Sequence, residues 1–203
     1  SHTYLAAAYG AKVWAVEPYE FHARRLHIMG QLNGWDLTVF CGGADNVTGE
    51  HVIHHTGSNI EMRNVLLEPG KQILKTWTVP VVRMDEFVHE TKKITLLKVD
   101  TDGHDYKALL GARGLFTNPG VKYAKIELIP YTLETVHPEL KNPAMDLLLY
   151  LRELGLVIYH VHVGAHYSIM EWFCVDDLAL LEPGEEQVLL DELFEKRTPD
   201  FPW

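Results

Sequence analysis

The chain has 203 residues, of which 47% are apolar and 23% are charged, so it can bury a sizeable core as a single domain over residues 1–203. Its 18 Lys and Arg residues against 28 Asp and Glu residues give a net charge of −10, and no basic cluster is present, which argues against nucleic acid as a partner. Without a run of about 18 to 20 apolar residues or a basic-then-apolar leader, we expect no membrane insertion, and a cytoplasmic or organelle interior is favoured over secretion. The two cysteines, Cys41 and Cys174, are too few for a disulfide framework and are expected to be buried thiols.

The chain starts inside an expected helix. Residues 1–9 (SHTYLAAAY) are rich in alanine and typical of the body of a helix rather than of an N-terminal tail, and Gly10 suits the end of that helix. Ser1 is also not an initiator methionine. We therefore expect the domain to be N-terminally incomplete, with a further segment before Ser1.

A strand, a helix and a second strand are expected next. Residues Ala11–Val16 (AKVWAV) form a short apolar run, ended by Glu17 and Pro18, that fits a buried parallel strand. Residues Tyr19–Gln31 place their apolar side chains at mostly helical spacing, and Leu37–Cys41 then predicts the second strand.

The middle of the chain has a different pattern. Residues His51–Thr56 and Glu61–Leu67 flank Gly57-Ser58-Asn59 as the two strands of a hairpin flank their turn, and Val79–Met84 is a further β-rich piece. This part of the sequence therefore predicts an antiparallel insertion.

The second half returns to alternating strands and helices. Residues Ile94–Val99 (ITLLKV) are the clearest core strand, and a helix is expected from about His104 to Leu115. The other expected elements are strands over Tyr123–Ile129, Leu156–Val163 and Ser168–Val175, a helix over Pro143–Leu154 and an amphipathic tail over Glu185–Lys196. Together they predict a three-layer α/β domain with a mostly parallel sheet, an antiparallel last strand and an inserted β-hairpin. Its ligand site is expected at the carboxyl ends of the strands.

Polar residues at two strand ends are the candidates for chemistry. Glu17 closes the first strand, where a carboxylate can accept hydrogen bonds from both ribose hydroxyls of a nucleotide-like cofactor, although a solvated carboxylate is the alternative. Asp100-Thr101-Asp102-Gly103-His104 concentrates two carboxylates and an imidazole after the Ile94–Val99 strand. Carboxylates two apart can bind a divalent ion, or one can act as acid or base while Asp102 caps the following helix.

Two other residue sets are given structural roles. His160 and His162 have a spacing that permits metal binding, but no compact carboxylate partner accompanies them, so no metal site is expected. The tryptophans, Trp77 among them, are expected to be packing residues because aromatic side chains at element boundaries usually are.

Five segments occur in an order that carries a family resemblance: Ala6–Pro18 (AAAYGAKVWAVEP), Val79–Phe87 (VPVVRMDEF), Leu96–Ala112 (LLKVDTDGHDYKALLGA), Lys125–Leu128 (KIEL) and Leu147–Tyr159 (LLLYLRELGLVIY). They resemble the FkbM-type S-adenosylmethionine-dependent methyltransferases, which act on hydroxyl groups. The third segment is similar to the family's strand–helix segment, usually I-D-V-E-G followed by a leucine-rich helix that ends in G-A. The resemblance covers about Ser1 to Tyr159 and implies a Rossmann-like methyltransferase sheet.

The resemblance also implies a set of cofactor residues. With S-adenosylmethionine as cofactor, Glu17 would bind the ribose hydroxyls, Tyr19 would lie against the adenine, and Asp45 would approach the adenine amine. Asp100 would lie near the methionine end of the cofactor.

The remaining implied residues belong to catalysis and to the acceptor. Asp102, His104 and Glu127 would contact the acceptor, with Ser58 in the Gly57–Asn59 turn as a further contributor, and His104 or Asp102 is the candidate base. Asp100, Asp102 and His104 are therefore the predicted catalytic residues. The acceptor is expected to be a small molecule, a sugar or a lipid-linked group with a hydroxyl.

Two features depart from the family pattern. Asp102 replaces the family's glutamate and is one methylene shorter, which shifts its reach. The glycine loop that lets backbone approach the cofactor's carboxylate end is absent, so we expect these 203 residues to bind the cofactor poorly by themselves.

Three functions are compatible with these observations. The first is an O-methyltransferase that acts on a hydroxyl group. The second is a catalytically inactive descendant that serves as a structural or assembly subunit, since a fold does not imply its activity. The third takes Asp100 and Asp102 as the D-x-D motif of a metal-dependent sugar-nucleotide transferase, which leaves Ala6–Pro18 unexplained. The sequence leaves open whether the protein is a homo-oligomer or part of a larger complex.

Overall fold

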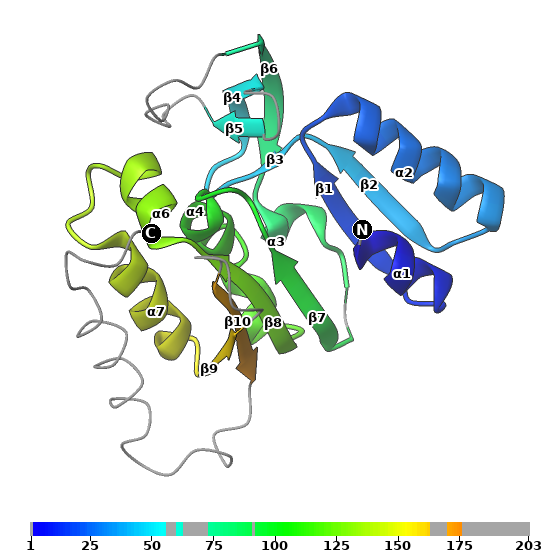
Figure 1. Ribbon diagram of the computed structural model, residues 1–203. Coiled ribbons are helices and arrows are strands. Elements are labelled where there is room, and N and C mark those ends of the chain that lie inside the picture. The colour runs from blue at the N-terminus through cyan, green and yellow to red at the C-terminus, as the bar shows by residue number, and fades with distance from the viewer. Residues whose placement is uncertain (1, 56–59, 63–72, 91, 163–169, 176–203) are drawn as a thin grey trace. The chain divides into compact units, whose positions relative to one another are not determined.

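The computed structural model describes residues 2–55, 60–62, 73–90, 92–162 and 170–175 (Figure 1). The chain divides into two compact units: residues 1–89 with 107–112, and residues 90–106 with 113–203. Both units combine helices with strands, so the mixed α/β class that the sequence predicts is confirmed.

The first unit begins with the expected helix, strand, helix and strand. These are α1 (His2–Ala8), β1 (Val13–Glu17), α2 (Glu20–Asn33) and β2 (Leu37–Cys41). The strands β1 and β2 pair in parallel, as Figure 1 shows, and α2 makes the crossover between them. Helix α2 ends at Gly34, whose φ of +64° lets its N–H bond back to the last helical carbonyls.

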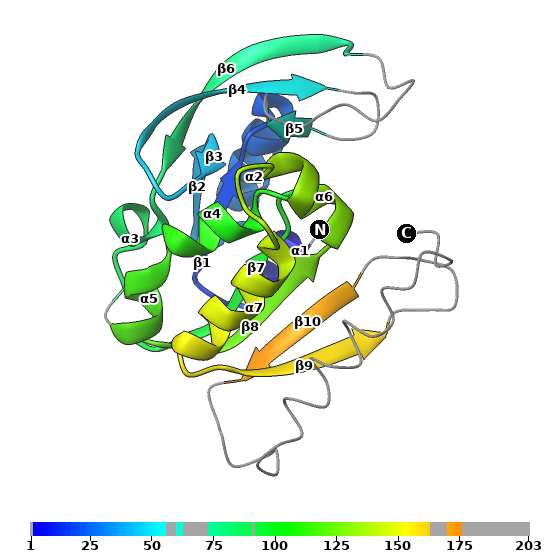
Figure 2. The same cartoon turned by 90° about the vertical axis from the view of Figure 1, so that its left-hand side faces the viewer.

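The expected antiparallel insertion forms the second sheet of this unit. Its strands β3 (Gly43–Ala44), β4 (Gly49–His55), β5 (Ile60–Met62) and β6 (Lys75–Val82) lie in the order β3-β6-β4-β5. Strand β4 is antiparallel to both β5 and β6, and the two long strands run side by side in Figure 2. The predicted Gly57–Asn59 turn and the predicted strand residues 63–67 lie outside the described residues. The short helix α3 (Met84–Phe87) follows β6.

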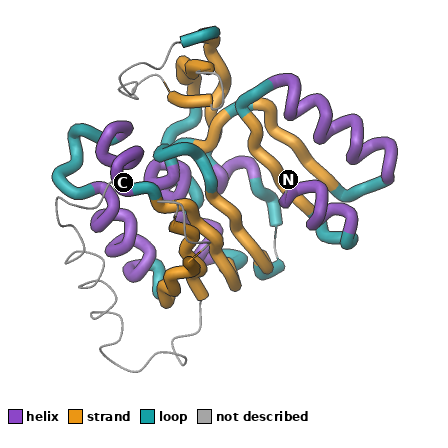
Figure 3. The backbone as a smooth tube through the Cα atoms, in the orientation of Figure 1, coloured by secondary structure: helices purple, strands orange, loops and turns teal. Residues whose placement is uncertain are grey.

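The second unit contains a four-stranded mixed sheet. Its strands are β7 (Ile94–Val99), β8 (Val121–Leu128), β9 (Val157–His162) and β10 (Met170–Val175), in the order β7-β8-β10-β9. Strands β7 and β8 are parallel, and β10 is antiparallel to both of its neighbours. Helices α5 (Arg113–Thr117), α6 (Pro130–Val136) and α7 (Pro143–Glu153) belong to the same unit, with α7 packed on α6 and on β9 (Figure 3). The core includes the fully buried side chains of Ile126, Leu147 and Leu151.

Three expectations require correction. The single helix expected from His104 to Leu115 is two helices, α4 (Asp105–Leu110) and α5, because the backbone at Gly111 approaches the Asp45 carbonyl so closely that a Cβ there would lie 1.9 Å from its oxygen. Helix α6 was not predicted, since it is short and starts at a proline that resembles a turn residue. Cys41 is exposed rather than buried, because it is the last residue of β2. The side chain of Cys174 and the tail over 185–196 lie outside what the structure describes.

Candidate functional site

The loop after β7 is held in place by a carboxylate that sequence reasoning missed. Asp105 accepts hydrogen bonds from the backbone N–H groups of Thr101 and Gly103, each at 3.1 Å. Its side chain is 2% exposed, and this burial raises its pKa to about 6 despite those hydrogen bonds. Asp105 thus fixes the loop from the first turn of α4. A carboxylate four residues after Thr101, at a helix start, is the signal that could have identified it.

The same loop has an unusual backbone. Asp102 has a φ of +50° and Gly103 a φ of +94°, both in the left-handed region. A Cβ at Gly103 would lie 2.5 Å from the Thr132 methyl group and 3.0 Å from a Val136 methyl group of α6. The unpredicted helix α6 therefore supports the loop, and only glycine fits between them. Aspartate tolerates a left-handed backbone better than most residues, which gives a physical reason for a short side chain at position 102.

Two predicted site residues meet at the carboxyl ends of β7 and β8. The parallel register pairs Val99 with Ile126, so Asp100 and Glu127 follow on neighbouring strands. Burial of Glu127, together with the negative charges of Asp100, Asp105 and Asp102 and a hydrogen bond with Asp100, raises the pKa of Glu127 to about 8. The Lys98 ammonium forms an ion pair with Asp100. Glu127 therefore holds its proton to a higher pH than an ordinary solvated carboxyl group does.

His104 lies on the buried side of the loop. Its side chain is 5% exposed, and its ring centroid lies 5.9 Å from that of His137, which is itself completely buried. The ring of Tyr106 packs edge-on against His137, and Glu139 lies 3.4 Å from His137 Nδ1. This surrounding packing makes His104 part of the support beneath the loop.

In the first unit, Glu17 and Tyr19 form one local arrangement where β1 ends and α2 begins. Glu17 Oε1 accepts a hydrogen bond of 2.9 Å from the backbone N–H of Tyr19, and Glu17 Oε2 lies 4.0 Å from His22 Nδ1. The ring of Tyr19 lies 5.9 Å from that of Trp77 and 5.0 Å from that of His22. Trp77 comes from β6, and nothing in the sequence near Tyr19 predicts this contact.

Asp45 is buried against a histidine that was also missed. Its side chain is 1% exposed; Oδ2 lies 2.8 Å from Nε2 of His51 on β4, and Oδ1 accepts a hydrogen bond from the backbone N–H of Asn46. The backbone of Asp45 donates to Val82 O, at the end of β6. Asp45 therefore joins the turn after β3 to the β4–β6 pair.

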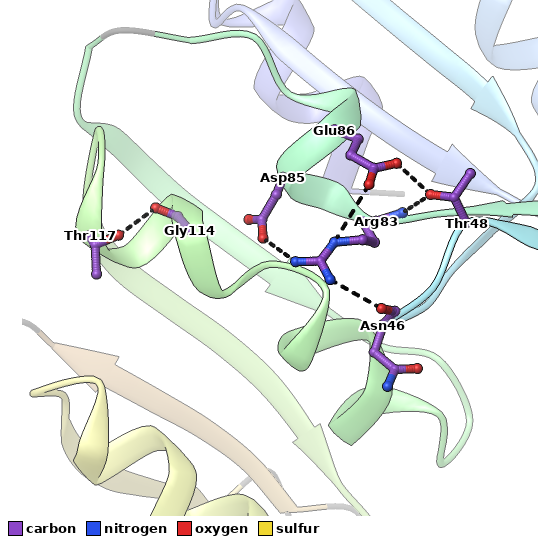
Figure 4. A network of polar contacts seen from close by, with 7 residues as sticks. All are labelled: Asn46, Thr48, Arg83, Asp85, Glu86, Gly114 and Thr117. Carbon is purple, nitrogen blue, oxygen red and sulfur yellow. Dashed lines mark hydrogen bonds and ion pairs between the residues drawn. The ribbon is translucent and has the colours of Figure 1, made fainter.

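A network around Arg83 fixes the turn that carries Asp45 (Figure 4). The guanidinium donates to the Asn46 carbonyl at 3.3 Å and to Asp85 at 3.1 Å, and its Nε lies 3.7 Å from Glu86. The Thr48 hydroxyl donates to Glu86 and accepts from the Arg83 N–H. Figure 4 also shows the Thr117 hydroxyl bonded to the Gly114 carbonyl within α5 of the second unit.

The predicted residues thus fall into two groups. Glu17, Tyr19 and Asp45 belong to the first unit, and Asp100, Asp102, His104 and Glu127 belong to the second. Ser58 lies outside the described residues, as do the side chains of His160 and His162. Among the residues that the structure describes, no group of three or more His, Cys, Asp or Glu side chains could hold a metal ion. None of the described helices combines the length and apolar character needed to cross a bilayer.

The parallel pairs β1–β2 and β7–β8, the helices between their strands and the carboxylates at the strand ends are features of a mixed α/β protein. The family model described as "Methyltransferase FkbM domain" matches residues 1–157. The chain therefore belongs to the FkbM methyltransferase family, and the resemblance stated from its sequence segments is confirmed. No curated protein and no solved structure matches the chain significantly.

Proposed function

We propose that the protein is an S-adenosylmethionine-dependent O-methyltransferase that acts on a hydroxyl group of a small molecule, a sugar or a lipid-linked acceptor. The observation that carries the proposal is the Asp100–Glu127 carboxyl pair, in which the pKa of Glu127 is raised to about 8. A general base is most effective when its pKa lies near the working pH, and removal of a hydroxyl proton is the step for which this reaction needs a base. Membership in the methyltransferase family supplies the reaction class.

The side chains of the first unit fit the adenosine part of this cofactor. Glu17 has a carboxylate whose oxygens can accept from a ribose diol, and Tyr19 adds an aromatic ring beside it. When bound, the sulfonium group of the cofactor supplies an activated methyl group, so the protein's task is alignment and proton removal.

Glu127 is the proposed base in preference to His104 and Asp102. As the acceptor oxygen bonds to the methyl carbon, the carbon–sulfur bond breaks with its electron pair going to sulfur, and the hydroxyl proton passes to the Glu127 carboxylate. Asp100, held by Lys98, raises the proton affinity of Glu127. Asp102 is proposed to contact the acceptor from the loop, and the buried His104 to hold that loop in place.

The proposal includes the three-layer Rossmann-like arrangement and a single domain over residues 1–203. The parallel pairs β1–β2 and β7–β8, each connected through helices, and the antiparallel strand β10 support this arrangement. No described contact favours the D-x-D transferase, since Lys98 supplies a cation at Asp100 where that enzyme class requires a metal ion.

Calorimetry of S-adenosylmethionine binding to the full-length protein tests the proposal. We expect a micromolar dissociation constant that Glu17→Ala weakens at least tenfold. The matched control is Glu20→Ala, which removes an exposed carboxylate of α2 that pairs only loosely with Arg24. Absence of binding to the folded wild-type protein contradicts the proposal and favours the inactive structural subunit.

A further inference from the structure

The β4–β6 pair presents one face to the core of the first unit. In the antiparallel register His51 lies opposite Val79, and Ile53 lies opposite Trp77, so these four side chains share a face. Ile53 and Val79 are buried and anchor this face, whereas His51 and Trp77 are half-buried. The core contacts of Ile53 and Val79 therefore fix where the other two side chains stand.

The two half-buried side chains contact residues expected to bind the cofactor. Trp77 packs on Tyr19 with ring centroids 5.9 Å apart and planes tilted by 45°. His51 Nε2 lies 2.8 Å from Asp45 Oδ2. On the opposite face of the same strands, His54 Nδ1 lies 2.8 Å from the Thr76 hydroxyl and Thr78 is exposed, so the contacts with Tyr19 and Asp45 belong to one face only.

We propose that this face of the β4–β6 pair is the adenine-recognition wall of the cofactor site, with Trp77 as a ring-contacting residue and His51 as the residue that reads the adenine edge. The inference rests on the proposed use of S-adenosylmethionine. It replaces the direct contact expected from Asp45 by an indirect one, in which Asp45 is a positioning residue behind His51.

Solvent exposure indicates which of Asp45 and His51 contacts the adenine amine directly. The Asp45 side chain is 1% exposed and that of His51 is 35% exposed, so the histidine is the member of the pair that a ligand can reach. A neutral imidazole that donates from Nε2 to a carboxylate carries an acceptor at Nδ1, the polarity that an adenine amine requires. His51 and Trp77 are diagonal neighbours across the strand pair, a separation of about 7 to 8 Å between backbone positions. In the proposed wall, an adenine ring stacks beside Trp77 with its amine edge towards His51.

The contribution of Trp77 to this wall is tested by calorimetry and by tryptophan fluorescence on the full-length protein, with S-adenosylmethionine as the probe. We expect Trp77→Ala to weaken binding by about 5- to 100-fold, the range that loss of one base–aromatic stack produces, and Trp77→Phe to restore most of it. The binding-dependent change in emission should disappear in Trp77→Phe. Thr78→Ala, on the outer face of the same strand, should bind as the wild type does.

The role of His51 is tested by base discrimination, which a merely structural residue does not control. Adenosine and inosine differ at the six-position, where inosine lacks the amine. We expect the wild-type protein to prefer adenosine about tenfold or more and His51→Ala to lose this preference, whereas His54→Ala on the outer face keeps it. His51→Asn, which retains an acceptor, serves as the second variant, and circular dichroism confirms folding of each variant.

The possible outcomes separate this inference from the proposed function. If the wild-type protein binds S-adenosylmethionine and both Trp77→Ala and His51→Ala bind it equally well, the wall is wrong and the methyltransferase proposal stands. If the folded wild-type protein does not bind the cofactor at all, the proposed function fails and this inference fails with it. Loss of affinity in Trp77→Ala together with loss of discrimination in His51→Ala supports the wall.

Discussion

The ionisation of Glu127 depends on its burial and on three carboxylates from the segment between the end of β7 and the first turn of α4. Burial is the largest cause of its raised pKa, and the carboxylates of Asp100, Asp105 and Asp102 add to it. Because the folded protein holds this proton up to about pH 8 whereas the unfolded chain releases it near pH 4.5, the folded state binds more protons between these values. The stability contributed by this group is therefore present at low pH and is lost as the pH rises towards 8.

Glu127→Gln removes this titration and keeps a side chain that can donate to Asp100. We expect the variant to become more stable relative to the wild type as the pH rises from about 4.5 to about 8, since it has no proton to release. Urea unfolding at pH 5 and pH 8.5 measures the difference, and Glu134→Gln on the exposed side of α6 is the control. An equal stability difference at the two pH values contradicts the prediction.

The same substitution tests catalysis. If Glu127 is the base, the methyl-transfer rate of the wild type should rise with pH through a midpoint near pH 8 to a plateau above it, and Glu127→Gln should lower the rate by about 100- to 10,000-fold. The rate is measured as transfer of a labelled methyl group from S-adenosylmethionine to an acceptor hydroxyl. If Glu127→Gln keeps both the rate and the pH profile of the wild type, the base is another residue.

Gly103 is required for two separable reasons, its φ of +94° and its contact with α6. Gly103→Ala should destabilise the protein by about 1 to 2 kcal/mol for the left-handed backbone and by about 1 to 3 kcal/mol more for the overlap with Thr132. Gly155→Ala is the matched control, because Gly155 has a φ of +79° and no atom within 4 Å of the added Cβ. If Gly103→Ala and Gly155→Ala lose the same stability in thermal unfolding, the contact between the added Cβ and α6 costs no free energy, and the prediction is wrong.

The helices and strands that form because of interactions among nearby residues are the ones that the sequence pattern predicts. Strands β1 and β2 and the helix between them form from a short apolar run, helical spacing and a glycine stop that lie within 30 residues of one another. The break between α4 and α5 has no such local cause, because it results from the approach of Asp45 to Gly111. Gly111 lies in a segment whose leucines and alanines otherwise favour one continuous helix.

Gly111→Ala tests this account of the break. The added Cβ would lie 1.9 Å from the Asp45 oxygen, so the backbone has to move, and we expect a loss of about 1 to 3 kcal/mol or more. Gly49→Ala adds the same atom in open space at the start of β4 and should change stability by less than about 1 kcal/mol. Chemical denaturation of both variants measures the difference, and a neutral Gly111→Ala contradicts the explanation.

For the full chain, cofactor binding and stability are linked. A ligand that binds only the folded state at a concentration of 100 times its dissociation constant stabilises a protein by about 2.7 kcal/mol. For a domain of about 150 to 250 residues this corresponds to a rise of roughly 5 to 10 °C in melting temperature. Differential scanning fluorimetry of the full-length protein with S-adenosylmethionine should show this rise for the wild type and a much smaller one for Glu17→Ala. A rise in the variant as large as in the wild type removes Glu17 from the cofactor site.

The sequence alone determined the α/β class, most of the strands and helices, and the family, because each depends on short patterns of apolar spacing, strand-end carboxylates and glycine stops that neighbouring residues complete. It also identified Asp100 and Glu127 separately. Only the tertiary structure decided that the charge of Asp100 raises the pKa of Glu127, because the parallel register of β7 and β8 places the two residues on neighbouring strands. In the same way, the β4–β6 register brings His51 to Asp45 and Trp77 to Tyr19. Contacts between residues far apart in the chain depend on how strands pair, and no local pattern encodes that pairing.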